Sequence, residues 1–364
     1  MKRILKKMLP AAAKRAIVLG IDGFSLFLAR ACATNGVLAG LYYAFFSRRF
    51  DREHLAVLRG RLAYAKSLRE IGETSPLLRR NIHRLEKGLI MKPRRPLFAE
   101  GFIAETVHCY ARAAANLDYS PAELKWATDV LDAYFDVVEP SPVVEQAQQV
   151  YALCSQTGGT ERPILVPPTF RPYPRSDSPP CNISHDALQA LFIRRRSVRW
   201  YQPIPVPGDL IQKCIDSAAL APSACNRQPF RFIVANGVER ASRVAQCAGG
   251  TVGFAEQLPA VVVVVGDLSA YPKEQDRHLI YIDGSLASMQ FMLAAETLGL
   301  STCPINWPDV DAAEVRLQKL IHLPEYERVV MLIAVGYPDE EGGIPYSQKK
   351  EYRLLGQDMV TDDH

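Results

Sequence analysis

The sequence predicts an α+β fold in its C-terminal half and an all-helical region before it. Apolar residues recur every three or four positions from Arg48 to about Tyr151, which is typical of amphipathic helices. Seven prolines then crowd the stretch from Glu161 to Cys181. Beyond that stretch, short apolar runs that suit buried strands alternate with helical patterns, and this order favours an α+β sandwich.

The proline-rich stretch also sets the predicted domain boundaries. Each proline removes a backbone donor and fixes φ, so neither a helix nor a central strand can continue through it. We therefore expect a helical region over residues 1–160, a linker over 161–182 and the mixed domain over 183–364.

Capping residues and apolar runs place the individual elements. Ser75-Pro76 and Ser120-Pro121 each pair a capping hydroxyl with a proline at the first helical position, and a third helix begins near Gly101. In the second half, Ser184 caps a helix that ends near Arg195. The other expected elements are a helix opened by Pro207-Gly208-Asp209, strands at 230–235, 259–266 and 329–335, and a long apolar helix from 283 to 298.

Composition and charge exclude several classes of protein. With 364 residues, 48% hydrophobic and 23% charged, the chain is neither disordered nor collagen-like, nor is it a small disulfide scaffold. A net charge of +4 is too mild to indicate a nucleic-acid partner. The eight cysteines form no C-x-x-C pair, so we expect no metal site. Scattered thiols suit a reducing, cytoplasmic compartment.

The N-terminal segment combines basic residues with an apolar stretch from Ala16 to Phe46. It resembles a signal peptide or a membrane anchor, but Asp22 and Arg30 interrupt it. The uncharged run from Ala31 to Ser47 barely reaches the length that spans a bilayer. We expect buried helices of a soluble protein here. The alternatives are a basic segment that lies on a membrane surface and a spanning helix or cleaved signal.

A cluster of cations follows the helix capped by Ser184. Arg194, Arg195, Arg196 and Arg199 surround Ser197, and guanidinium groups with a hydroxyl form a compact anion site. The alternative is a solvated basic helix end that the helix dipole favours.

Three further segments carry polar groups in stiff or open backbone. The loop from Ala221 to Phe230 holds Asn226 and Gln228 between two prolines, where their amides could read a polar planar ligand; the alternative is a connecting turn. Downstream, a strand is expected to break at Pro304, which would free backbone amides as donors to an oxyanion or a flavin N5. The alternative there is that Trp307 is only a core residue. The last segment holds Lys349 and Lys350, which either close on a phosphate or form a solvated tail.

In this order, the motifs resemble the nitroreductase family of FMN-dependent oxidoreductases over roughly Ile183 to Arg353. The resemblance rests on Arg-x-Ser-x-Arg, Ala-Pro-Ser-x-x-Asn-x-Gln-Pro-Phe, the Asp283-Gly284 helix, Leu298-Gly299-Leu300 and Pro304-Ile305. It implies an FMN-binding α-β-α sandwich, a homodimer with FMN at its interface, NAD(P)H as electron donor and a small organic electron acceptor.

The resemblance also implies site residues. Arg195, Arg196 and Ser197 resemble the family's contacts to the FMN phosphate, and Lys349 or Lys350 would complete that site. Arg199 resembles the basic residue near flavin N1 and O2, where a cation raises the potential. Asn226, in the loop with Gln228, resembles the polar contact to the ring and ribityl chain. Pro222 and Ser223 resemble residues that reach FMN from the partner subunit, and Pro304, Ile305 and Asn306 match the segment along the ring.

Some positions depart from the family pattern. Where some members place Asn and Lys, the stretch from Gly253 to Leu258 offers Ala255 and Leu258, which leaves the substrate and the pyridine nucleotide open. The spacing of Gly249, Gly250 and Gly253 does not fit a dinucleotide-binding Rossmann unit. No catalytic side chain is assigned.

The segment from Arg79 to Gly88 predicts a cationic helix face. Arg79, His83 and Lys87 are one turn apart and share a side, while Glu86 is expected to face elsewhere. The segment resembles nitroreductase-like proteins of bacterial surface-polysaccharide clusters, which implies a role in that biosynthesis. The alternatives are a charged helix that contacts the other domain or a partner, and a non-catalytic or regulatory flavin-binding module that docks a polysaccharide-biosynthesis partner.

Overall fold

The computed structural model describes residues 10–157 and 169–356. Its contacts divide the chain into two units, Met1–Arg59 and Gly60–His364. Residues 161–168 of the predicted linker lie outside the described residues, and the boundaries near 160 and 182 stay a prediction.

In the part of the first unit that the structure describes, the chain is helical. It contains α2 (Ala11–Cys32), α3 (Gly36–Tyr42) and the π-helical turn η1 (Tyr43–Ser47), and α4 (Asp51–Ser67) contains the boundary to the second unit. Between residues 23 and 50 every residue is exposed or half-buried. Over these residues the prediction of buried helices was wrong, since large apolar side chains such as Phe24, Phe27 and Phe45 are exposed. None of the described helices is both long enough and apolar enough to cross a bilayer.

Four helices form a bundle at the start of the second unit: α5 (Pro76–Leu89), α6 (Glu100–Ala115), α7 (Pro121–Phe135) and α8 (Pro142–Thr157). Both predicted caps are confirmed, since Ser75 accepts from the Leu78 N–H and Ser120 from the Glu123 N–H. The bundle has its own apolar core, in which Leu78, Ile82 and Leu85 of α5 are fully buried.

The rest of the second unit is a mixed domain with one antiparallel sheet in the order β1-β2-β4-β3. Its strands are β1 (Phe230–Asn236), β2 (Ala260–Asp267), β3 (Ser301–Asn306) and β4 (Glu327–Gly336). Its α-helices are α9 (His185–Arg194), α10 (Gly208–Ala218), α11 (Val238–Ala245), α12 (Leu279–Thr297), α13 (Asp311–Ile321) and α14 (Tyr352–Leu355). Short 3₁₀ turns include η3 (Ala224–Asn226) and η4 (Ala255–Gln257).

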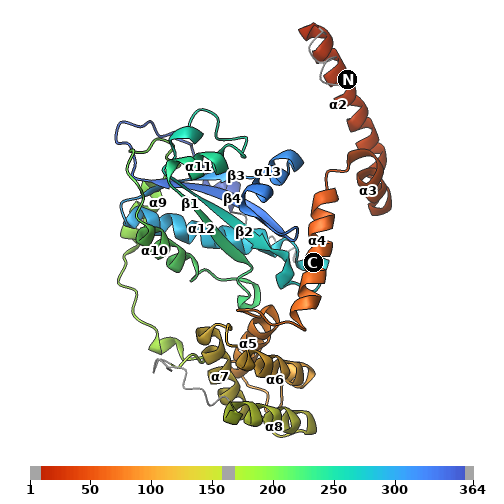
Figure 1. The fold of residues 1–364 in the computed structure, drawn as a ribbon, viewed down its shortest axis with the longest axis vertical. Coiled ribbons are helices and arrows are strands. Elements are labelled where there is room, and N and C mark those ends of the chain that lie inside the picture. Colours follow the sequence, from red (N-terminus) through yellow and green to blue (C-terminus); the bar gives the residue numbers. More distant parts are fainter. Residues whose placement is uncertain (1–9, 158–168, 357–364) are drawn as a thin grey trace, which may run out of the picture. The chain divides into compact units, whose positions relative to one another are not determined.

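The valine run of β2 explains the three layers. Helices α11 and α13 cover one face of the sheet, and α10 and α12 cover the other (Figure 1). Val261, Val263 and Val265 pack in the core on the first face, whereas Val262 and Val264 pack in the core on the second. Because side chains alternate across a strand, a sheet covered on both faces needs an apolar residue at every position. The predicted α-β-α sandwich, preceded by helices, is confirmed.

Strand β3 corrects one expectation. The sequence predicts a break at Pro304, yet Pro304, Ile305 and Asn306 remain in register with Ile333, Leu332 and Met331 of β4. The reason is that β3 is an edge strand, and a proline whose nitrogen faces the open edge removes no hydrogen bond from the sheet.

Candidate functional site

The cationic segment after α9 runs along the open edge of β3. Ser197 forms a parallel bridge with Thr302, and the Val198 N–H donates to the Thr302 carbonyl at 3.1 Å. The structure therefore brings the predicted anion-binding segment beside the predicted ring-contacting strand.

This bridge also fixes which backbone groups of β3 point outward. The Thr302 carbonyl faces Val198 and not β4. Because the N–H and C=O groups of alternate residues point to the same side of a strand, the Pro304 nitrogen and the Asn306 N–H face that same outer side. Asn306 is exposed. The free donor expected beyond Pro304 thus exists as an edge amide, although the strand does not break.

Positive charge gathers at this edge. Burial raises the pKa of the Cys303 thiol on β3, and the charges of Arg199 and Arg195 oppose that rise, which places both cations near the strand. Arg194 lies 3.4 Å from the buried Glu296 carboxylate. Within the described part of the chain neither Arg195 nor Arg199 has an ion-pair partner, so their charge is available to an anion.

Arg196 contacts the C-terminal tail. Its Nη2 donates to the Pro345 carbonyl at 2.6 Å and also to the Tyr346 carbonyl. The tail that carries Lys349 and Lys350 therefore begins beside the cationic segment, and both lysines are exposed. The guanidinium of Arg196 tethers this tail in the structure.

Gln257 is a contact that the sequence reasoning missed. Its Nε2 donates to the Arg199 carbonyl, and its Oε1 accepts from the Tyr201 N–H at 3.4 Å. Ala255 and Leu258 beside it are buried in the domain core. The sequence offered no clear signal for this contact, because the exposed Glu256 beside Gln257 is polar as well. Gln257 fixes the backbone that carries Arg199.

The loop between α10 and β1 is held in an unusual conformation. Cys225, Asn226 and Gln228 all have positive φ, at 53°, 50° and 49°, and such backbone costs about 1–3 kcal/mol per residue unless its surroundings fix it. The Gln228 N–H donates to Ser223 Oγ at 3.0 Å. The Ala224 N–H donates to Asp283 Oδ2 at 2.9 Å, so α12 supports the loop.

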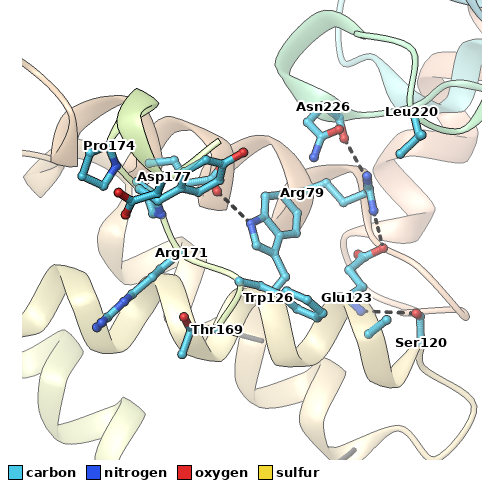
Figure 2. A pocket seen from close by; sticks show the side chains of 15 residues that line it. Arg79, Ser120, Glu123, Trp126, Thr169, Arg171, Pro174, Asp177, Leu220 and Asn226 are labelled. Carbon is cyan, nitrogen blue, oxygen red and sulfur yellow. Dashed lines mark hydrogen bonds and ion pairs between the residues drawn. The ribbon is translucent and has the colours of Figure 1, made fainter. Parts of the chain in front are cut away.

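Arg79 of α5 joins the helical bundle to this loop (Figure 2). Its Nε donates to the Asn226 carbonyl at 2.9 Å, its Nη2 to Gln228 Oε1 at 2.7 Å and its Nη1 to Glu123 Oε2 at 3.0 Å. Gln228 Nε2 donates to the Ala219 carbonyl at 2.7 Å. Both ends of the Gln228 amide therefore hold the loop, whereas the sequence suggested that this amide reads a ligand.

The cationic face predicted for α5 also differs in detail. Arg79 turns to the loop, and His83 Nδ1 lies 3.1 Å from Glu86 Oε2. Glu86 therefore lies with His83 and not away from it. Helical spacing places residues on a face, but an i,i+3 pair still brings opposite charges together.

A pocket of about 1100 Å³ adjoins the loop, between α5, α7 and residues 169–177. Figure 2 shows Trp126 between Arg79 and Arg171 at this pocket. Phe170 and Tyr173 also line it, and Trp126 Nε1 donates to Glu86 at 2.9 Å. Aromatic walls with a few charged groups suit a small organic molecule.

The loop and the cationic segment are not joined directly. Within the described part of one chain, no hydrogen bond or ion pair links residues 222–228 to residues 195–199. No group of three or more His, Cys, Asp or Glu in the described residues could hold a metal ion.

Comparisons with known proteins match the mixed domain. The nitroreductase family matches residues 193–250 and 239–337. A putative NADH dehydrogenase/NAD(P)H nitroreductase of Methanothermobacter thermautotrophicus is 33% identical over 163 residues, which are 43% of this chain and 80% of that protein. A protein of the same description from Archaeoglobus fulgidus is 34% identical over 159 residues, 42% of this chain and 85% of that one. An FMN-dependent nitroreductase from Clostridium difficile R20291 is 26% identical over 47% of this chain and 98% of that chain, with a TM-score of 0.40.

Proposed function

Because the chain belongs to the nitroreductase family, we propose that it is a homodimeric, FMN-dependent oxidoreductase that passes electrons from NAD(P)H to a small organic acceptor. The observation that carries the proposal is the cationic segment at the edge of β3. There, Ser197 bridges Thr302, and Arg195 and Arg199 have no ion-pair partner among the described residues.

The donor set fits FMN. Arg195 and Ser197 supply a guanidinium and a hydroxyl for the phosphate, and Lys349 or Lys350 on the tail tethered by Arg196 would complete that site. The outward Asn306 N–H, with Pro304 and Ile305 on the same strand, offers a donor to the ring. Arg199 would place a positive charge beside the flavin ring. Bound FMN supplies the hydride or electron transfer itself.

The partner subunit would complete the site. Pro222 and Ser223 lie in a loop that one chain does not bond to its own cationic segment. A loop supplied by the second copy is the arrangement that the family resemblance implies. Gln228 and Arg79 then act by fixing this loop, which presents the Asn226 side chain.

Two features support the rest of the proposal. The aromatic pocket that touches Asn226 has the size of a site for a small organic molecule, and we assign the electron acceptor to it. No protein acid is assigned, and solvent would provide the proton.

All eight cysteines are free, which supports a reducing, cytoplasmic compartment. The place in surface-polysaccharide biosynthesis rests only on the resemblance of the segment from Arg79 to Gly88.

A second candidate is a non-catalytic or regulatory flavin-binding module that docks a polysaccharide-biosynthesis partner. The observation that favours it is that Ala255 and Leu258 are buried in the core and place no polar side chain at the ring. Bound flavin that neither NADH nor NADPH reduces would support this module and not the enzyme.

Titration of the flavin-free chain with FMN tests the shared part of both candidates. We expect quenching of FMN fluorescence that saturates at one FMN per chain, in a species that sediments as a dimer. A chain that leaves FMN fluorescence unchanged at every concentration would contradict both candidates.

A further inference from the structure

The first 50 residues carry a charge that the rest of the chain does not share. They contain nine lysines and arginines and a single acidic residue, Asp22, which gives a net charge of +8. The other 314 residues hold 34 basic and 38 acidic residues, a net charge of −4. Such asymmetry indicates a segment with a partner of its own, of negative charge.

The same segment exposes large apolar side chains. Phe24 and Phe27 of α2 are 64% and 65% exposed, and Val37, Phe45 and Phe46 are 75%, 73% and 62% exposed. Ser25 Oγ lies 3.3 Å from Tyr42 Oη, so α2 and α3 contact each other, yet no residue from 23 to 50 is buried. Apolar surface of this extent is unfavourable in water, and it marks an interaction surface.

Charge and exposed apolar groups together indicate which partner binds this segment. A second copy of the segment would bring nine more cations against the first nine, which is repulsive. A bilayer that contains anionic phospholipid offers negative headgroups to the basic side chains and acyl chains to Phe, Leu and Val. We propose that this N-terminal segment, the first 50 residues, binds the surface of an anionic membrane and holds the chain there. This proposal does not depend on the proposed function of the second unit.

Vesicle flotation of the full chain tests the proposal. Vesicles of phosphatidylcholine alone are compared with vesicles that also contain phosphatidylserine, each at low and at high NaCl. We expect binding to the phosphatidylserine vesicles that weakens as salt is added, because salt screens the attraction. Equal flotation with both kinds of vesicle, or none with either, would overturn the proposal.

Two double variants separate the two contributions. Arg30→Gln with Arg49→Gln removes two exposed cations, and each loss should weaken binding to phosphatidylserine vesicles about fivefold. Phe45→Ser with Phe46→Ser should weaken binding at every salt concentration, because its contribution is apolar. The matched controls are Arg94→Gln with Arg95→Gln and Leu117→Ser with Val252→Ser, which alter exposed residues of the second unit and should leave flotation unchanged.

The variants also distinguish a membrane from a second copy of this chain as the partner of the segment. If the wild-type chain forms oligomers without vesicles, and Phe45→Ser with Phe46→Ser dissociates them while neither protein floats, the surface is an interface between copies and the proposal is wrong. FMN content, measured on the same samples, should be identical in all variants. A failure of FMN binding therefore leaves the flotation result interpretable.

Discussion

Arg79 donates a hydrogen bond from its Nε to the main-chain carbonyl of Asn226, at 2.9 Å and 147 residues away along the chain. The same guanidinium binds Glu123, whose carboxylate also accepts from Thr74 at 2.6 Å and from the Ser75 N–H at 3.2 Å. One side chain thus ties the helical bundle to a loop of the mixed domain. This contact joins the bundle to a loop in which three residues have positive φ.

Replacing Arg79 with alanine should lower the free energy of unfolding by about 2 kcal/mol. Hydrogen bonds to charged groups contribute about 1.5–3 kcal/mol. The Thr74 hydroxyl and the Ser75 N–H still donate to the Glu123 carboxylate, and these bonds moderate the cost of removing its buried cationic partner. Urea denaturation measures the change, with the exposed Arg95→Ala as control. A loss within about 0.5 kcal/mol of the control, the usual surface effect, would contradict this role.

Replacing Arg195 with alanine should weaken FMN binding by about 2–5 kcal/mol, the usual cost of removing one partner of a hydrogen-bonded charge pair. Isothermal titration of flavin-free protein with FMN measures the effect. Arg240→Ala, an exposed arginine on α11, is the control and should bind FMN like the wild type. Equal affinities of the Arg195 variant and the wild type would remove Arg195 from the site.

Replacing Arg199 with alanine should change the flavin potential more than the FMN affinity. A cation beside the ring stabilises the negative charge of the reduced flavin, so its removal makes reduction less favourable. We expect a two-electron potential lower by on the order of 30 mV, which corresponds to about 1.4 kcal/mol. A spectroscopic redox titration measures this shift. A potential that rises, or one that stays fixed while FMN affinity collapses, would contradict the assignment.

Replacing Glu296 with glutamine should change the pH dependence of stability. Burial raises the pKa of Glu296 above its ordinary value of 4.5, although the Ser301 hydroxyl and the charges of Arg194 and Arg195 oppose the rise. The folded chain therefore holds this proton more tightly than the unfolded chain. The contribution of Glu296 to stability is present in acid and is lost as the pH rises through the folded pKa.

The wild type should thus lose stability relative to Glu296→Gln as the pH rises above the ordinary pKa of 4.5. Thermal or urea unfolding at several pH values gives the difference between the two proteins. The exposed Glu340→Gln serves as control, with a flat difference expected. If the stability of the wild type increased relative to that of Glu296→Gln as the pH rises, the pKa of Glu296 would be lowered and not raised in the folded chain, and the prediction would be wrong.

Local sequence signals predicted the parts of the fold that local chemistry determines. Ser75 and Ser120 cap helices because a hydroxyl before a proline satisfies the first free N–H groups wherever it occurs. The run from Val261 to Val265 indicates a strand covered on both faces because alternate side chains point to opposite sides. The order of motifs from Arg195 to Asn306 was enough to indicate the family.

The features that the sequence did not predict depend on neighbours far along the chain. Pro304 stays in β3 only because this strand lies at the edge of the sheet, a position that a proline does not reveal. Arg79 and Gln257 act through carbonyls of Asn226 and Arg199, and helical spacing carries no information about such contacts. The apolar residues around Phe24 were expected in a core, but among the described residues 23–50 none is buried.

An absorbance spectrum during anaerobic addition of NADPH to the FMN-loaded protein tests the central claim most directly. We expect the visible flavin bands to bleach when one equivalent of NADPH is mixed in, and to return when an organic acceptor such as a nitroaromatic compound is added. A spectrum that stays oxidised with both NADPH and NADH, while dithionite still bleaches it, would contradict the claim that this chain is an NAD(P)H-dependent oxidoreductase.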